Sequence, residues 1–273
     1  MKTIVSKDNP VLKKAQKLLT RKGREEAGSF LVEGRKLISE AASAGFRIEN
    51  VFVDSGALQC GEAAEGEYEN EIALEEKLFR NLARTVNPQP YIAVVRRPGL
   101  TEDCRREGAE SAAQFPAPGP VLGGERVLIL DRISDPGNAG TMIRTALAAG
   151  MSSVWCLKGT ADAFSDKAIR ASAGAVFHIP LVEGLDAADC IDRARRMGAR
   201  LFVCNAGGEN VYNKTFAGRF AVVVGSESAG VQEAFLDAAD EVAGIPMAEA
   251  AESLNAATAA AVVMYEALRQ RTV

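Results

Sequence analysis

The sequence predicts an α/β protein of two domains, the second of which contains a parallel sheet. Three observations lead to this prediction. Apolar strands alternate with helical stretches in the second half of the chain, a shorter mixed pattern precedes them, and a proline-rich segment separates the two patterns. With 47% apolar and 25% charged residues, the composition is that of a globular protein, and 273 residues suffice for two domains.

The first half opens with a basic helix. Asn9 and Pro10 are predicted to be its cap and first position, and the helix should fray near Gly23. A small α/β module follows. Its predicted elements are a strand at 30–32, a helix at 35–44 closed by Gly45, a strand at 51–53, a helix at 75–83 and a strand at 91–95.

The segment FPAPGPVLGGE, residues 115–125, marks the predicted domain boundary. Three of the ten prolines fall within five positions there, which favours an extended, semi-rigid connector. The predicted organisation is therefore a basic amino-terminal helix at 1–24, a small α/β domain at 25–114, a linker at 115–125 and a larger domain at 126–273.

The larger domain contains near-continuous apolar strands at 127–130, 154–157, 201–204 and 221–224, with helical stretches between them. This pattern is typical of a parallel sheet covered on both faces, which binds ligands beyond the carboxyl ends of its strands. We therefore expect the chemistry in the loops after Leu130, Val224 and Ile245.

Charge and cysteine content restrict the partners and the compartment. Residues 1–24 hold eight basic side chains against one acidic one, so this segment either binds a polyanion or is a solvated helix face. The sequence has no run of eighteen apolar residues, and its five scattered cysteines form no C-x-x-C pair. We expect reduced, mostly buried thiols, no metal site, no membrane association and a cytoplasmic location.

The first polar loop is RISDPGNAGTMIRTALAAG. Asn138 is a plausible helix cap. Arg144 is the only charged residue between Asn138 and Gly150 and lies near the helix amino end, where the helix dipole disfavours a cation. Because the guanidinium fork suits a phosphate or a carboxylate, Arg144 is a candidate binding residue, although a solvated surface arginine is the simpler alternative.

The second loop, Gly225 to Gly230, carries Glu227 at a strand's carboxyl end. Glu227 would orient Arg144 or a ligand hydroxyl, or it satisfies the dipole of the next helix. The spacing excludes three known motifs. Val231 stands at the lysine position of a P-loop, and Glu227 stands at the second glycine of a Rossmann fingerprint and at the serine of a nucleophile elbow.

The third loop leads into a long helix with a small-residue start. Ser253 is predicted to cap this helix, and Asn255 presents its amide either to a ligand or to a neighbouring loop. The alanine-rich run from Ala256 allows a close backbone approach, although core packing alone would explain it. His178, the only histidine, is expected to be a half-buried strand residue rather than a catalytic base.

In this order, the three loops resemble the signature motifs of the SpoU (TrmH-type) RNA 2′-O-ribose methyltransferases, a branch of the SPOUT superfamily. DPGNAGTMIRTALAAG resembles motif one, VVVGSESAG motif two and IPMAEAAESLNAATAAAVVMYEALRQ motif three. The segment KAIRASAGAVFHIP is also similar to the family pattern. The module from Phe30 to Val95 is similar to the family's RNA-substrate-binding domain, which has an L7Ae/L30e-like fold.

The resemblance implies a carboxyl-terminal SPOUT domain with a deep trefoil knot and a homodimer formed through the long last helix. It implies that S-adenosyl-L-methionine binds in the knotted loops. By position, the residues implied to enclose the cofactor are Gly225, Ile245 and Leu254, and those implied to form the polar active site are Asn138, Arg144, Glu227, Ser253 and Asn255.

The implied reaction is methyl transfer to a ribose 2′-hydroxyl, and large-subunit (23S) ribosomal RNA is the expected substrate. Arg144 would stabilise developing charge and anchor a phosphate, with Asn138 and Glu227 orienting it. Ser228 and Glu249 stand where the family usually has glycine. An alternative is therefore a non-catalytic RNA-binding protein that kept the fold, and a small-molecule α/β enzyme is a third hypothesis.

Overall fold

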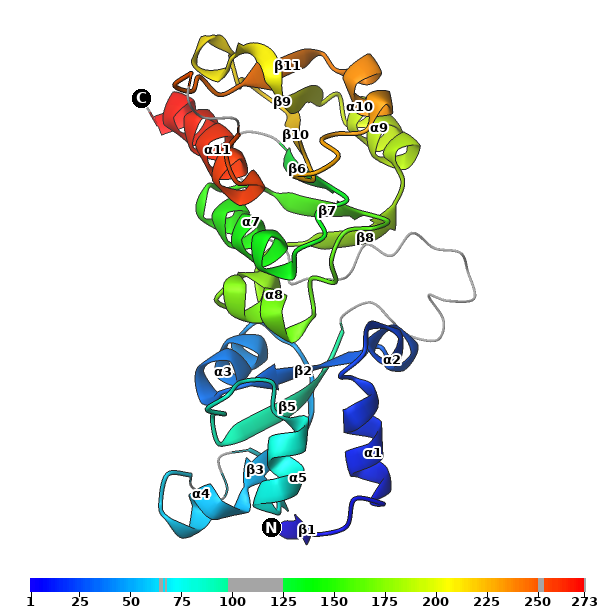
Figure 1. Cartoon of the computed structure of the whole chain (residues 1–273), viewed down its shortest axis with the longest axis vertical. Helices are drawn as coiled ribbons and strands as arrows, with labels where there is room; N and C mark the ends of the chain where they lie inside the picture. The colour runs from blue at the N-terminus through cyan, green and yellow to red at the C-terminus, as the bar shows by residue number, and fades with distance from the viewer. Residues whose placement is uncertain (64–65, 67, 98–124, 250–252, 273) are drawn as a thin grey trace. The chain divides into compact units, whose positions relative to one another are not determined.

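The computed structural model describes residues 1–63, 66, 68–97, 125–249 and 253–272 (Figure 1). The chain forms two compact units, each built around its own sheet. The predicted linker at 115–125 lies, apart from residue 125, outside the described residues, as does the end of the predicted first domain. No helix within the described ranges is long and apolar enough to span a lipid bilayer.

The amino-terminal unit is a mixed sheet with helices around it. Up to residue 97 its elements are β1 (Lys2–Ile4), α1 (Pro10–Lys17), α2 (Arg21–Ala27), β2 (Ser29–Glu33), α3 (Arg35–Ser43), β3 (Ile48–Asp54), α4 (Ser55–Gln59), β4 (Glu71–Leu74), α5 (Glu76–Leu82) and β5 (Tyr91–Arg96). The strand order is β1-β4-β3-β5-β2, with β5 antiparallel to both its neighbours. The predicted strands and helices of this module are present, whereas β1, α4 and β4 were not predicted.

The amino-terminal helix is two helices. Asn9 caps α1 as predicted, because its side chain accepts a hydrogen bond from the backbone of Val11 at 2.9 Å. The predicted fraying near Gly23 is wrong. Helix α1 ends at Lys17, Thr20 caps α2, and Gly23 lies buried inside α2, where a Cβ would come within 1.9 Å of the Lys17 carbonyl oxygen. Glycine is required there by the close approach of the two helices.

In the folded unit, part of the positive charge of the basic segment is offset by ion pairs with neighbouring glutamates. Arg21 pairs with Glu25 at 2.8 Å, Lys22 pairs with Glu26 at 3.7 Å, and the buried Arg24 donates to the Leu18 carbonyl at 2.8 Å. The acidic partners of Arg21 and Lys22 lie just beyond residue 24. The apolar face of α1 is buried in the unit's core through Leu12 and Ala15, and Leu18 at its C-cap is buried with them. Helix α1 is therefore part of the folded unit.

The carboxyl-terminal unit is a parallel sheet with helices on both faces, as predicted. From residue 125 on, the elements are β6 (Arg126–Asp131), α7 (Pro136–Ala148), β7 (Ser153–Leu157), α8 (Asp166–Ala171), η1 (Ala175–Phe177), β8 (Leu181–Leu185), α9 (Ala187–Arg196), β9 (Arg200–Asn210), η2 (Val211–Asn213), β10 (Phe220–Gly225), α10 (Glu233–Ala238), β11 (Glu241–Gly244) and α11 (Ala256–Thr272). The strand order is β11-β9-β10-β6-β7-β8, and neighbouring strands are parallel.

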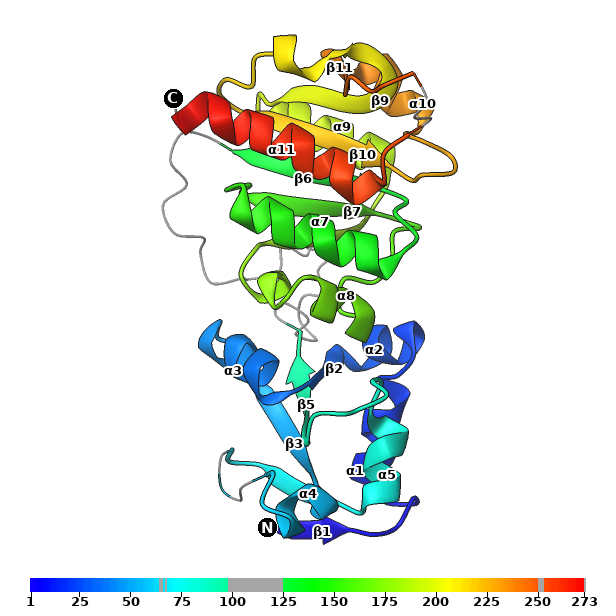
Figure 2. The same cartoon turned by 60° about the vertical axis from the view of Figure 1, so that its left-hand side comes forward.

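Helices α7 and α11 lie side by side on one face of this sheet, and α9 and α10 cover the other (Figures 1 and 2). Strand β8 was not predicted, and β11 was predicted only as a strand end before the loop that follows Ile245. The expected strand position of His178 is wrong, because this exposed residue follows the 3-10 turn η1.

Strand β9 leaves the regular ladder near its middle. It pairs with β10 up to Val203, and its pairing with β11 stops there and resumes only at Glu209. Residues 204–208 therefore bulge out of the sheet between the two paired parts of the strand. This irregularity places Cys204 to Ala206 beside the carboxyl end of β10.

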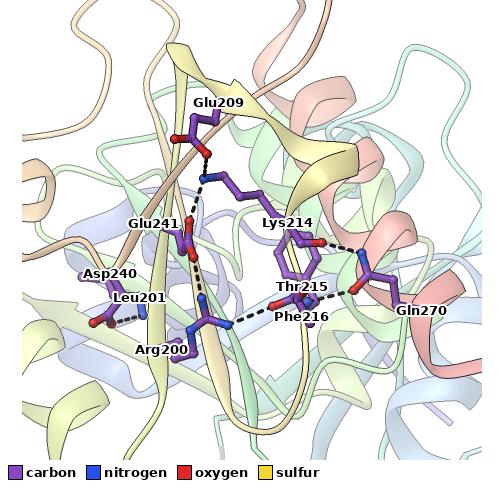
Figure 3. A network of polar contacts seen from close by, with 9 residues as sticks. All are labelled: Arg200, Leu201, Glu209, Lys214, Thr215, Phe216, Asp240, Glu241 and Gln270. Carbon is purple, nitrogen blue, oxygen red and sulfur yellow. Dashed lines mark hydrogen bonds and ion pairs between the residues drawn. The ribbon is translucent and has the colours of Figure 1, made fainter.

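A polar network fixes the far end of this bulge (Figure 3). The Lys214 ammonium donates to Glu209 and to Glu241, at 2.6 Å each, and only 6% of the Lys214 side chain is exposed. Arg200 also donates to Glu241, at 2.6 Å. The hydrogen bonds to Glu209 and Glu241 raise the pKa of Lys214, and the bond from Lys214 lowers the pKa of Glu241.

The last turn of α11 joins the same network. The Gln270 amide donates to the Lys214 carbonyl at 2.8 Å, and its oxygen accepts from the Phe216 backbone at 2.8 Å (Figure 3). Since Glu241 begins β11 and Gln270 lies near the end of α11, the network holds both ends of the chain stretch that runs from β11 into α11.

We expect Lys214→Met to lower the melting temperature at neutral pH, because two carboxylates then lose their buried counter-ion. The stabilisation from Glu241 is present above the ordinary pKa of a glutamate and is lost as pH falls through its lowered pKa. The gap between wild type and variant should therefore shrink in acid, which thermal unfolding over a pH series would measure. Lys158→Met is the matched control, since its pair with Asp186 is exposed and 3.8 Å apart. A gap that is independent of pH would contradict this role.

Candidate functional site

The candidate site is a cavity of about 270 Å³ at the carboxyl ends of β10 and β11, beside the bulge in the middle of β9. Most of its wall is apolar, and polar groups lie among these apolar residues. Its lining includes the predicted residues Gly225, Glu227, Ile245, Ser253 and Leu254. The other lining residues are Cys204, Asn205, Ala206, Val224, Ser226, Gly230, Val231, Ala243, Met247, Ala256 and Ala259.

The loop after β10 forms a closed turn on one side of this cavity. The Gly230 amide donates to the Ser226 carbonyl at 2.8 Å, so the chain folds back on itself within four residues. A Cβ on Gly225 would lie 2.3 Å from the carbonyl group of Gly230, which only glycine avoids. The turn exposes Glu227 at its tip.

One carboxylate oxygen accepts most of the hydrogen bonds in the polar part of the site. The Oε1 atom of Glu227 accepts from the Asn255 side-chain amide at 2.6 Å, from the Ala256 backbone at 3.1 Å and from the Asn138 side-chain amide at 3.2 Å. Asn255 also donates to the Asn138 side-chain oxygen at 3.2 Å. Asn138, Glu227 and Asn255, which lie far apart in the sequence, are thus in direct contact.

The helix caps differ from those predicted. Asp135, not Asn138, caps α7, with Pro136 at the first helical position. Asn138 is the third residue of α7, within its first turn, and its side chain is left to bond Glu227. Asn255, not Ser253, caps α11, because its side-chain oxygen accepts from the Ala257 and Thr258 backbones at 3.0 and 3.3 Å. One amide group therefore serves both the helix and the site.

Arg144 does not join this cluster. It is exposed on α7, and no hydrogen bond or ion pair found among the described residues includes its guanidinium. Asn138 and Glu227 contact each other and Asn255 rather than Arg144. The predicted orientation of Arg144 by these two side chains is therefore absent from the single chain.

The two residues that stand at family glycine positions leave the cavity open. Ser228 is exposed in the turn after Glu227. Glu249 lines a separate hollow of about 480 Å³, together with Gly208, Asn210 and Pro246, and does not line the cavity that contains Gly225. The two hollows share Ala206, Ile245 and Met247 as a common wall.

Sequence reasoning missed the wall supplied by β9. Cys204, Asn205 and Ala206 line the cavity because β9 is the neighbour of β10 and bulges there. Desolvation raises the pKa of the Cys204 thiol to about 12, so this side chain is a neutral, largely apolar wall element. A strand at 201–204 was predicted, but its place beside β10 was not.

Fold and site together define a class: an α/β protein whose parallel sheet presents a largely apolar ligand cavity with a fixed carboxylate and amides, joined to a smaller mixed-sheet unit. The profile of the SpoU rRNA Methylase family matches residues 125–265, and the profile of the MRM3-like substrate binding domain matches residues 9–93. The chain belongs to the SpoU rRNA methylase family.

Named relatives are similar over most of their length. The 23S rRNA (guanosine(2553)-2′-O)-methyltransferase RlmP of Bacillus subtilis is 33% identical over 97% of this chain and 98% of its own. The 23S rRNA (uridine(2479)-2′-O)-methyltransferase of Streptomyces viridochromogenes is 30% identical, over 92% of this chain and 86% of its own.

Solved structures agree with this assignment. An AdoMet-bound rRNA methyltransferase from Sinorhizobium meliloti is 29% identical with a TM-score of 0.79, and the match covers 98% of this chain and 97% of that one. The SpoU methyltransferase AviRb from Streptomyces viridochromogenes, in complex with AdoMet, is also 29% identical with a TM-score of 0.79, over 97% and 98% of the two chains.

We expect Asn255→Ala to lower the free energy of unfolding by about 1 to 2 kcal/mol, because α11 loses its cap. Asn255→Ser should cost less, since a serine oxygen still caps the helix although it cannot reach Glu227. Denaturant unfolding would measure both values, with Ser228→Ala as an exposed control in the neighbouring turn. Equal stability of wild type and Asn255→Ala would contradict the cap.

Proposed function

We propose that this cavity binds S-adenosyl-L-methionine and that the chain transfers its methyl group to a ribose 2′-hydroxyl in 23S rRNA. By its family and its named relatives, the chain is an S-adenosylmethionine-dependent rRNA 2′-O-methyltransferase. The observation that carries the site assignment is that Gly225, Ile245 and Leu254 line one cavity next to the Glu227 cluster.

The cavity suits this cofactor in chemistry. Its volume of about 270 Å³ is close to the lower end of the range of small-molecule sites, roughly 300 to 1,000 Å³. Val224, Ile245 and Leu254 offer apolar surface for the faces of an adenine ring. Ser226 and Ser253 supply hydroxyl groups for its polar edges.

The chain's own residues position the reactants. S-adenosylmethionine supplies a methyl group already activated on a sulfonium. Glu227, Asn138 and Asn255 form a polar cluster fixed by mutual hydrogen bonds, and we assign to it the orientation of the target ribose. Ser253 and Asn255 would orient the cofactor tail or the ribose. Such a preorganised cluster saves reorganisation at the moment of transfer.

Arg144 is proposed to stabilise the developing alkoxide and to anchor an RNA phosphate. A guanidinium keeps its proton in proteins, so it acts as a fixed charge and not as a base. Its exposure on α7 supports contact with a second molecule rather than with its own chain's cavity. Leu147 lies one turn further on, on the same exposed helix face.

We propose that the chain works as a homodimer through α7 and α11. Two large apolar side chains, Leu147 on α7 and Tyr265 on α11, are 37% and 48% exposed, and the two helices lie side by side (Figure 2). Exposed apolar side chains on adjacent helices favour association. Such an interface would border Arg144.

The remaining assignments complete the proposal. Residues 9–93 would bind RNA, with Lys14 and Lys17 as exposed cations on α1, in a unit with the expected L7Ae/L30e-like fold. From the family resemblance we also propose a deep trefoil knot in the carboxyl-terminal domain. From the sequence we propose a linker at 115–125 between a domain at 25–114 and one at 126–273, and a cytoplasmic location. Helix α1 contributes to the core, so deletion of residues 1–24 would also damage the fold. Replacing Lys14 and Lys17 by uncharged residues therefore tests RNA binding better.

The alternative, a non-catalytic RNA-binding protein, depended on Glu249 blocking the cofactor. The position of Glu249 in the neighbouring hollow favours the catalytic hypothesis. Calorimetry with S-adenosylmethionine separates the two hypotheses directly, because a chain that has lost cofactor binding gives no heat of binding.

Ribose methylation of 23S rRNA, mapped in cells with and without this gene, tests the proposed reaction. We expect one position to lose its 2′-O-methyl group in the deletion strain and to regain it with the wild-type gene. An unchanged methylation map, together with no transfer from the methyl donor to ribosomal RNA by the purified protein, would overturn the proposal.

We expect Arg144→Ala to reduce turnover by about 100-fold or more while the melting temperature stays unchanged, because the side chain is exposed. Arg144→Lys keeps the charge but loses the planar fork, so its activity should be intermediate. Single-turnover methyl transfer would measure both variants. Near-normal turnover in Arg144→Ala would remove this residue from the mechanism.

A further inference from the structure

A buried carboxylate lies behind the cavity and takes no part in lining it. Asp131 is the last residue of β6 and is 0% exposed. Its Oδ2 accepts from the Gln232 backbone at 2.7 Å, and its Oδ1 accepts from the Gln232 side-chain amide at 2.7 Å and from the Arg132 Nε at 3.0 Å. The two oxygens of Asp131 therefore hold Gln232 by its backbone and its side chain together.

The position of Asp131 relates it to the turn that carries Glu227. In the β6–β10 ladder, Gly225 is the register partner of Asp131. The chain leaves the sheet at Gly225, makes the turn and returns at Gln232 to the same carboxylate. Gly230 and Val231, the two residues before Gln232, line the cavity.

Within the turn, the hydrogen bonds are local. The Gly230 and Ala229 amides donate to the carbonyl and the hydroxyl of Ser226, at 2.8 and 3.2 Å. These bonds shape the turn but do not attach it to β6. The attachment at its carboxyl end is made by Asp131, and a shift of Gln232 would move Val231 and Gly230 into or away from the cavity.

Because Asp131 is buried, its carboxylate needs hydrogen-bond donors from the protein. A carboxylate out of water is costly unless its oxygens are hydrogen-bonded. Arg132 adopts a left-handed backbone conformation, with φ of 57°, which is uncommon for a residue other than glycine. In this conformation its Nε reaches Asp131. A strained residue beside a buried carboxylate whose two oxygens both accept hydrogen bonds indicates a specific local constraint.

We propose that Asp131, through Gln232, is a positioning residue that sets the cofactor-side wall of the cavity and the placement of Glu227. This inference rests on the proposed binding of S-adenosylmethionine. The carboxylate acts through the turn and touches neither cofactor nor RNA. Affinity for the methyl donor should therefore depend on a pair of residues that lies outside the cavity.

An exchange of the two side chains tests the proposal. Gln232→Glu places a second carboxylate against Asp131, so the turn should be pushed out of position. In the double variant Asp131→Asn with Gln232→Glu, the new asparagine amide donates to the new glutamate, and its oxygen still accepts from the backbone of residue 232. The Arg132 Nε loses its acceptor at this position, but its side chain is 39% exposed, so it can turn to water or pair with the new glutamate. Ala234→Glu, which adds the same charge at an exposed position two residues on, is the matched control.

We expect Gln232→Glu to weaken the binding of S-adenosylmethionine and to raise its KM by about tenfold or more. Both values are measured at a temperature well below the melting temperature of the variant. The double variant should return both values to within about threefold of wild type, and Ala234→Glu should leave them unchanged. A merely structural role would lower the melting temperature without changing KM. Calorimetry, steady-state kinetics and thermal unfolding give the three readouts.

Wild-type affinity in Gln232→Glu, or a double variant no better than this single variant, overturns the inference. If Gln232→Glu does not fold, Gln232→Leu decides, because it loses the side-chain bond but keeps the backbone bond to Asp131. Wild-type affinity in that variant also overturns the inference. Failure of the wild-type protein itself to bind the methyl donor would instead overturn the proposed function.

Discussion

The site depends on a single acceptor, the Oε1 atom of Glu227, which receives hydrogen bonds from two helices at once. One donor comes from Asn138 in the first turn of α7, and two come from Asn255 and Ala256 at the start of α11. All three hydrogen bonds to this oxygen form only while the first turns of α7 and α11 and the turn after β10 keep their positions relative to one another. The side of the cavity that the turn and the start of α11 supply, through Glu227 and Ala256, therefore depends on this convergence.

Much of the fold could be predicted because apolar strands are a strong local signal. The strands at 127–130 and 221–224 are buried on both faces of the parallel sheet, and they were found. Strand β4 was missed because it begins at Glu71, within a glutamate-rich stretch. Of β11 only the carboxyl end was predicted, because the strand begins at Glu241 and is four residues long. The cap at Asp135 could have been predicted, since Pro136 marks the first helical position.

The site was harder to predict than the fold, because its geometry depends on which strands are neighbours. The motif resemblance indicated Asn138, Glu227 and Asn255, and the structure brings them together. The contribution of Cys204 to Ala206 follows from the position of β9 beside β10, which no local pattern encodes. Arg144 likewise lies outside the cluster because it is on the exposed face of α7. The sequence shows that a charged residue stands at position 144, but it does not show which group that residue contacts.

Two buried charges hold segments that lead into the cavity wall, and neither is explained by stability alone. Asp131 holds the turn after β10, and Lys214 holds the start of β11. Replacing a buried ion and its partners by apolar residues of similar volume is often neutral or stabilising, so such groups are weak contributors to the free energy of folding. Apolar contacts, however, are non-directional and tolerate sliding, whereas hydrogen bonds to a carboxylate fix a segment in one register. Each charge holds a segment that continues into the cavity wall, to Val231 in one case and to Ala243 in the other, where a shift of one residue would replace a wall residue. Their positions therefore indicate that these charges contribute geometric specificity at the site.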